Sequence, residues 1–144
     1  MIKTASKIAA ALAAGSLLVA GFGAGAAANA KPRLTPEQEL ARALEGRVAG
    51  EPKDCIYLPR VVNTRVYDKT AIVYDTGTTL WVNRPDSGAS SLDDNDIMVT
   101  TPWNAQLCNV DIVRMVDRNV GFWRGSVGLG KFVPYTKVKA DKAG

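Results

Sequence analysis

The sequence contains no histidine anywhere in its 144 residues. Histidine is the usual general base at neutral pH and a common zinc ligand, so its absence excludes imidazole catalysis and histidine-ligated zinc. No serine lies in the Gly-x-Ser-x-Gly setting of a nucleophile elbow. These absences favour a non-catalytic protein, and we expect neither a cofactor nor a bound metal.

Cysteine is scarce as well. Only Cys55 and Cys108 are present, 53 positions apart, and two cysteines cannot build a zinc site without other ligands. An even pair in an exported chain predicts a disulfide, whereas a redox pair would need a Cys-x-x-Cys spacing that is missing here. By loop entropy, such a bridge would disfavour the unfolded chain by about 4 kcal/mol.

The long apolar run is confined to the N-terminus. Lys3 and Lys7 accompany an apolar stretch over residues 8–22, and small residues follow at Ala28–Ala30. This order predicts a signal peptide over residues 1–30, cleaved near Ala30, with an uncleaved membrane anchor as the disfavoured alternative. Cleavage leaves 114 residues, enough for one domain, in a periplasmic or secreted location and without a stable membrane span.

The excess of positive charge is small. The whole chain has 18 basic and 14 acidic residues, and its formal charge of +4 falls to +2 when Lys3 and Lys7 leave with the signal peptide. So weak a charge does not predict nucleic acid or an anionic membrane as a partner. We divide the chain into the signal peptide (1–30), a helix and linker (31–53), a β-rich domain (54–136) and a basic tail (137–144).

One helix is predicted, over residues 34–48. Thr35 suits the N-cap, Pro36 suits the first helical position, and Gln38 completes a capping box. A narrow apolar stripe runs along the helix through Leu40, Leu44 and Val48. A helix this short needs support from tertiary packing, and we expect it to dock on a sheet face that carries Val61, Val73 and Trp81.

Residues 61–83 predict a three-stranded antiparallel meander, because three runs rich in β-branched and aromatic residues are separated by short polar turns. The segment Asp75–Gly77 suits a three-residue loop with Gly77 in the left-handed conformation. This loop would pair Tyr74 with Thr78 and Ile72 with Leu80. An earlier turn at residues 67–69 would pair Thr64 with Ile72 and Val62 with Tyr74. The predicted buried face then carries Val62, Val66, Ile72, Tyr74, Leu80 and Val82.

Shorter runs complete the predicted fold. Further strands are expected at residues 55–58, 96–101, 110–117 and 128–135, with 110–117 in a central position and 118–125 as a loop. We therefore predict a mainly β fold, an antiparallel sheet or small open barrel of about six strands with one N-terminal helix.

The Asp75–Gly77 sequence, Asp-Thr-Gly after an apolar strand, is similar to the active-site loop of pepsin-like proteases. That chemistry needs two aspartates that share a proton, so a single motif would require a homodimer. The competing interpretation, which we favour, is a hairpin turn in which Asp and Gly have their usual roles. Asp75 is therefore a weak catalytic candidate.

Two other motifs suggest chemistry that their surroundings disfavour. Residues 125–132 match a phosphate-binding loop except at Phe132, where a Ser or Thr would hold magnesium, and no helix is expected to follow. Close packing of strands explains these glycines better. The acidic cluster Asp93–Asp96 lacks the spacing of an EF-hand loop and is interpreted as a solvated turn.

Four short segments resemble a family of small exported proteobacterial proteins that is classed as a domain of unknown function. They are Asp54–Ile56, Thr64–Asp68, Gln106–Val113 and Gly128–Tyr135. The resemblance covers roughly residues 52–137 and implies export and a small β-rich fold, but no activity or site. Members often carry further cysteines near the positions of Gly88 and Val127. This chain has no cysteine at either position, so no second disulfide is expected here.

The predicted function is a non-catalytic periplasmic binding or envelope-associated domain whose partner, an envelope protein or a small ligand, the sequence does not identify. The alternative is an aspartic-protease-like hydrolase that uses Asp75 in a homodimer. The candidates for a recognition surface are Trp81, Trp103 and Trp123. Trp81 could equally belong to the core, whereas Trp103 and Trp123 lie in predicted loops and are expected to be exposed.

Overall fold

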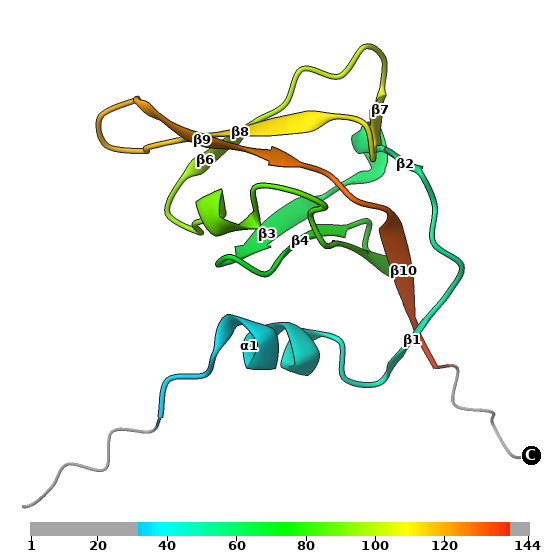
Figure 1. Ribbon diagram of the computed structural model, residues 1–144. Coiled ribbons are helices and arrows are strands. Elements are labelled where there is room, and N and C mark those ends of the chain that lie inside the picture. The colour runs from blue at the N-terminus through cyan, green and yellow to red at the C-terminus, as the bar shows by residue number, and fades with distance from the viewer. Residues whose placement is uncertain (1–31, 139–144) are drawn as a thin grey trace, which may run out of the picture. The chain divides into compact units, whose positions relative to one another are not determined.

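The computed structural model describes residues 32–138, so the predicted signal peptide lies outside the described residues. Within this range there are one α-helix, two 3₁₀ turns and ten short strands, all paired antiparallel (Figure 1). The mainly β fold with one helix is therefore confirmed. The strand count exceeds the prediction of about six, because the short strands Arg47–Ala49 and Gln106–Cys108 and a strand that begins in the predicted loop 118–125 were missed.

The single helix, α1 (Pro36–Ala43), begins as predicted but ends earlier. Thr35 and Gln38 form the expected capping box, in which each side chain accepts a hydrogen bond from the other residue's backbone N–H. The predicted extension to Val48 is wrong, because Gly46 turns the chain in the left-handed conformation and Val48 pairs with Thr136 in a strand.

A five-stranded antiparallel sheet forms the middle layer, in the order β1-β10-β5-β4-β3. Its strands are β1 (Arg47–Ala49), β3 (Asn63–Tyr67), β4 (Ala71–Asp75), β5 (Thr79–Asn83) and β10 (Phe132–Lys137). The first and last of these in the chain, β1 and β10, pair with each other, so the end of the predicted helix and the start of the predicted tail both belong to this sheet.

The predicted meander is present, but its second hairpin has a different register. Tyr74 pairs with Trp81 rather than Thr78, and Ile72 pairs with Asn83 rather than Leu80. The loop is longer than predicted because the N–H and the hydroxyl of Thr76 both donate to the Thr79 carbonyl oxygen, at 3.0 and 3.1 Å.

This register shift of three positions moves alternate side chains to the opposite face of the sheet. Leu80 and Val82 lie on the face covered by α1, together with Val73, whereas Trp81 and Val61 pack on the other face. The predicted docking face of the helix was therefore right for Val73 and wrong for the other two residues. The first hairpin shifts by two positions, pairing Thr64 with Tyr74, and so keeps the predicted alternation of faces. The predicted burial of Val62 is wrong, because this residue precedes β3 and is 73% exposed.

Two smaller sheets form the third layer. One pairs β2 (Cys55–Tyr57) with β7 (Gln106–Cys108), and the other has the order β6 (Ile97–Val99), β8 (Ile112–Val116), β9 (Trp123–Gly128). The central position predicted for residues 110–117 is confirmed by β8. The 3₁₀ turns η1 (Leu58–Arg60) and η2 (Ala89–Ser91) lie in the connections between strands.

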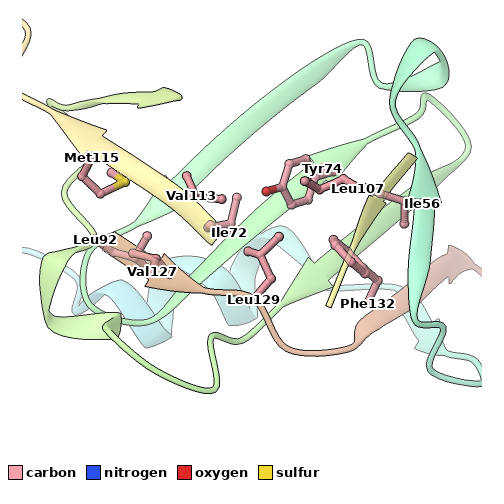
Figure 2. Packing of buried hydrophobic residues seen from close by; sticks show 10 residues of the cluster. All are labelled: Ile56, Ile72, Tyr74, Leu92, Leu107, Val113, Met115, Val127, Leu129 and Phe132. Carbon is pink, nitrogen blue, oxygen red and sulfur yellow. The ribbon is translucent and has the colours of Figure 1, made fainter. Parts of the chain in front are cut away.

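Two hydrophobic clusters hold the three layers together. The helix-side cluster lies between α1 and the five-stranded sheet, and its buried residues are Leu40, Tyr67, Ala71, Val73, Leu80 and Val82. The inner cluster lies between that sheet and the third layer (Figure 2). It consists of Ile56, Ile72, Tyr74, Leu92, Leu107, Val113, Met115, Val127, Leu129 and Phe132.

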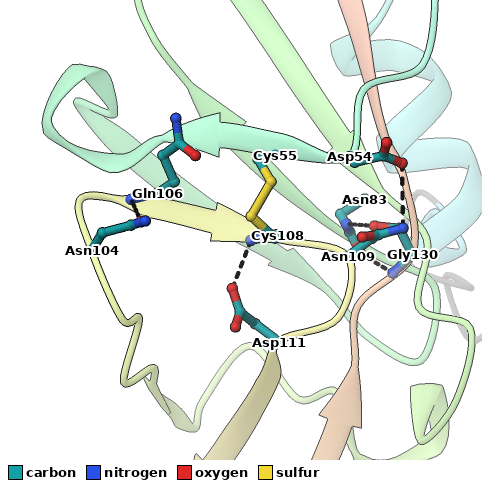
Figure 3. Close-up of a disulfide and its surroundings, with 9 residues drawn as sticks. All are labelled: Asp54, Cys55, Asn83, Asn104, Gln106, Cys108, Asn109, Asp111 and Gly130. Carbon is teal, nitrogen blue, oxygen red and sulfur yellow. Dashed lines mark hydrogen bonds between the residues drawn. A yellow bond between two sulfur atoms is a disulfide. The ribbon is translucent and has the colours of Figure 1, made fainter.

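The predicted disulfide between Cys55 and Cys108 is confirmed. It joins directly opposed residues of β2 and β7, whose Cα atoms are 4.0 Å apart (Figure 3). The adjacent side chains of Ile56 and Leu107 belong to the inner cluster, so the bridge joins the two strands that cover this part of the cluster.

The glycine-rich segment has a structural role rather than that of a phosphate-binding loop. It runs from β9 into β10 with no helix after it. A Cβ atom at Gly130 would collide with the carbonyl oxygen of Arg84. The buried Asn83 side chain also binds both backbone groups of Gly130, donating to its oxygen at 2.6 Å and accepting from its N–H at 3.2 Å (Figure 3). The prediction that close packing explains these glycines therefore holds at Gly130.

Candidate functional site

The sheet β6-β8-β9 has one buried and one exposed face. Along its central strand, Val113 and Met115 have no exposed surface and belong to the inner cluster. The alternate residues Ile112 and Arg114 point away from that cluster, and Ile112 is 62% exposed. Because side chains alternate along a strand, the same five residues build both the core and a surface.

Cross-strand pairing places more apolar side chains on the exposed side. Ile97 and Trp123 both pair with Val116, and Val99 pairs with Arg114. Trp123 is 67% exposed, and both Ile97 and Val99 are also exposed. We call this surface the outer face, consisting of Ile97, Val99, Ile112, Arg114, Val116, Trp123 and Ser126.

Loops at both ends extend the outer face. At one end, Trp103 is 100% exposed and Val110 is also exposed. Both line a hollow of about 400 Å³ that continues onto the outer face. A second hollow, of about 460 Å³, contains Trp123 and shares Val99, Arg114 and Ser126 with the first. The structure thus brings two of the three predicted tryptophans, Trp103 and Trp123, to one continuous surface.

Arg114 is the charged centre of this surface. It is the middle residue of β8 and lines both hollows, and among the described residues it makes no side-chain hydrogen bond or ion pair. By contrast, Arg124 pairs with Asp117 at 3.1 Å and with the buried Asp96 at 3.4 Å. Arg114 therefore offers a guanidinium group without an ion pair among mainly apolar side chains. The one carboxylate that shares a hollow with it, Asp111, accepts a hydrogen bond from the N–H of Cys108 at 2.7 Å.

The β8–β9 turn beside Trp123 is held by Asp117. Its Oδ1 accepts hydrogen bonds from the N–H groups of Asn119 and Val120, at 2.8 and 3.1 Å. These bonds, with the nearby guanidinium of Arg124, hold the pKa of the Asp117 carboxyl below its usual range. The same turn presents Phe122, another exposed aromatic residue, next to Trp123 in the chain.

Trp81 does not join the outer face. Its half-buried side chain lies on β5, packs against the inner cluster and lines a separate groove together with Tyr57. The sequence left the core and surface interpretations of Trp81 open. In the structure, Trp81 is partly buried against the inner cluster and partly exposed in the groove.

Asp75 lies at the end of β4, where its Oδ1 accepts a 2.7 Å hydrogen bond from the N–H of Gly77. Gly77 has the predicted left-handed conformation, with φ 87°. The charged neighbours of Asp75 in a hollow of about 210 Å³ are Arg47 and Arg65. No second carboxylate lines this hollow, so the geometry matches a hairpin turn and provides no aspartate pair within the described chain.

Carboxylates do gather at one other place, between two turns. Oxygen atoms of Asp68, Asp93 and Asp94 lie within 4.8 Å of one another. Asp68 accepts a hydrogen bond from the N–H of Asp94 at 2.7 Å, and Asp93 accepts one from the N–H of Asn95 at 2.9 Å, which holds the pKa of Asp93 below its usual range. These bonds explain the cluster as a turn, as predicted for residues 93–96. Asp68 was not expected there because it comes from a distant hairpin.

The residues that sequence reasoning missed are those of the outer face other than Trp123. The alternation in residues 110–117 was recognised, but both sides of that strand carry apolar residues, so the pattern did not show which side is buried. Arg114 lacks an ion-pair partner because of how three strands pair, so no local pattern in the sequence indicates it.

No helix in residues 32–138 is long and apolar enough to cross a membrane. The resemblance noted from the sequence stays a prediction. Comparisons with protein-family models, with curated proteins and with solved structures found no match to this chain.

Proposed function

We propose that this chain is an exported, non-catalytic binding protein that docks a partner protein through its outer face. The observation that carries the proposal is the continuous surface of exposed apolar side chains around Arg114, with Trp103 and Trp123 at its two ends. The predicted signal peptide supports export, and the Cys55–Cys108 disulfide is compatible with it.

Exposed apolar side chains become informative when they are contiguous. Single exposed apolar residues are common, but large apolar patches on a protein surface mark interaction sites. Tryptophan and arginine are also enriched among the residues that carry most of the binding energy at protein interfaces. The outer face combines both features, with Arg114 between two aromatic residues.

The charge of Arg114 favours a protein over a lipid as the partner. A guanidinium group in hydrocarbon is costly, whereas a carboxylate on a protein partner would pair with it by two parallel hydrogen bonds. A second copy of this chain fits less well, since a twofold contact centred on the face would bring two Arg114 side chains together. We therefore infer a partner with an apolar surface and a carboxylate near its centre.

The experiment is photo-cross-linking in the cell, with the native export signal. A benzophenone amino acid replaces Ile112 on the outer face, and the matched control carries it at Val62, which is 73% exposed on a different part of the surface. The expected result is a covalent adduct to one protein species from position 112 and none from position 62. The adduct should disappear in Arg114→Glu, and the identified protein should bind the purified chain directly.

Other occupants of the outer face would give other products. An adduct between two copies of this chain, or an adduct to phospholipid, would overturn the proposal, as would the absence of any adduct at position 112. An adduct that forms equally from position 62, or that survives Arg114→Glu unchanged, would also contradict it.

A further inference from the structure

A second candidate site lies at the open edge between the middle layer and the sheet β2-β7. It is a groove of about 500 Å³. The β4–β5 hairpin forms one side, and β2 with η1 forms the other. The side chains that give it its chemical character are Lys53, Tyr57, Arg60, Thr78, Trp81 and Gln106. We call it the Trp81 groove. It shares none of these residues with the outer face.

Two aromatic rings give the groove apolar surfaces. Trp81 lies on an interior strand of its sheet, paired with Tyr74 on one side and Pro134 on the other, and it packs against the inner cluster. Such packing fixes the indole while part of it stays exposed to the groove. Tyr57, on the facing β2 strand, is 50% exposed. A rigid, partly exposed ring suits a ligand that itself has a flat apolar face.

Hydroxyl and amide groups surround these rings. The side chains of Thr78, Thr79 and Gln106 line the groove, and none of them has a hydrogen-bond partner in the described part of the protein. A threonine hydroxyl and a glutamine amide can each donate and accept. Groups that serve both roles match a ligand with several hydroxyls.

The charges in the groove have one sign. Lys53 and Arg60 line it, and neither forms an ion pair with a residue in 32–138. Asp54, which follows Lys53 in the chain, pairs instead with Lys131 at 3.4 Å. No carboxylate of residues 32–138 lines the groove, so an anionic group on a ligand would meet two cations that have no ion-pair partner there.

Taking these features together, we propose that the Trp81 groove binds a sugar that carries an anionic group, a carboxylate or a phosphate. The C–H face of the sugar ring packs on the indole of Trp81, and its hydroxyls bond to Thr78 and Gln106. Lys53 and Arg60 bind the anion. This site is separate from the outer face, and its ligand is recognised by different residues, so each proposal can fail without the other.

The test uses the fluorescence of Trp81 alone. The double variant Trp103→Phe/Trp123→Phe removes the two exposed tryptophans and leaves Trp81 as the single indole. The probes are glucuronate, glucose 6-phosphate, glucose, acetate and inorganic phosphate. We expect a saturable change with glucuronate or glucose 6-phosphate, which separates carboxylate from phosphate as the preferred anion. Glucose, acetate and inorganic phosphate should each bind at least about tenfold more weakly.

Charge variants in this background complete the test. Lys53→Gln and Arg60→Gln should each weaken binding of the anionic sugar about fivefold to tenfold, whereas Arg42→Gln on α1 should leave it unchanged. The proposal is overturned if neither anionic sugar binds at millimolar concentration. It is equally overturned if glucose or the free anions bind as tightly, or if Arg42→Gln has the same effect as Lys53→Gln.

Discussion

The two faces of the sheet β6-β8-β9 both carry apolar side chains, but one face is buried and the other is exposed. On the inner face, Val113, Met115 and Val127 are completely buried against the five-stranded sheet. On the outer face, Ile112 and Trp123 are more than half exposed. Apolar residues on both sides of one strand usually indicate a strand buried on both faces. Here the second cover is missing from the described chain.

The difference teaches that stability and recognition can be separated on one strand. Removing an inner side chain should destabilise the protein without removing a contact to a partner, because those atoms are buried. Removing an outer side chain should weaken binding of a partner and leave the stability nearly unchanged, because little buried surface is lost from the core. The predictions below test this separation, beginning with the largest expected effect.

The largest effect is expected for the disulfide that joins β2 and β7 in the third layer. Cys55→Ala/Cys108→Ala removes the bridge that closes a 53-residue separation, and it should lower the free energy of unfolding by about 4 kcal/mol. Urea denaturation measures this change, and reduction of the wild-type protein should produce a similar loss. A loss below about 1 kcal/mol would mean that the third layer holds its position without the bridge.

The next prediction compares the two faces directly. Met115→Ala leaves a cavity in the inner cluster and should cost about 3 kcal/mol of stability. Its matched partner, Ile112→Ala on the same strand, should change the free energy of unfolding by less than about 0.5 kcal/mol. Denaturation of both variants under the same conditions checks this. Equal losses would show that the outer face is covered in the folded protein.

Within the inner cluster, one polar atom weakens the core. The hydroxyl of Tyr74 is buried and has no hydrogen-bond partner among the described residues. The ring itself packs well, with its centroid 5.8 Å from that of Phe132. Tyr74→Phe keeps the ring and should raise the free energy of unfolding by about 1 kcal/mol. A destabilised variant would indicate that the hydroxyl does make a favourable bond.

The same hydroxyl predicts a dependence on alkaline pH. Burial raises the pKa of Tyr74 above its ordinary value of 10.0. Above pH 10 the unfolded chain therefore releases this proton while the folded chain keeps it, so stability falls as the pH rises. Tyr74→Phe should show a smaller fall in this window. An identical pH profile for both proteins would contradict the assignment.

The smallest effect is expected at the rim of the outer face. Phe122→Ser replaces an exposed ring in the β8–β9 turn and should change the free energy of unfolding by less than about 0.5 kcal/mol. It should also reduce the fluorescence of a hydrophobic dye bound to the native protein, because the apolar surface shrinks. A loss of stability above about 1 kcal/mol would place Phe122 in the core instead.

Local signals in the sequence were sufficient for the parts of the fold that local interactions control. The capping box of Thr35 and Gln38, the left-handed Gly77 and the Cys55–Cys108 pair are all present as predicted. Each depends on residue types with strong conformational or chemical preferences. Such preferences act over a few residues or join two unusual ones, so they are visible without a structure.

Features that depend on distant segments were not predictable. The register of β5 follows from two hydrogen bonds of Thr76 to Thr79, and its three-residue shift exchanged the faces of Leu80 and Trp81. Strands β1 and β7 have only three residues each, and the pairing of β1 with β10 joins opposite ends of the domain. The predicted exposure of Trp103 and Trp123 is confirmed, but their shared surface depends on how three strands pair.

The affinity of the cross-linked partner protein for wild type and Trp123→Ala tests the central claim most directly. Calorimetric titration of the purified proteins gives this affinity, and denaturation of the same samples gives their stability. We predict at least a tenfold loss of affinity, about 1.4 kcal/mol, with a change in unfolding free energy below about 0.5 kcal/mol. Unchanged affinity, or a loss of stability as large as the loss of binding, would contradict the account.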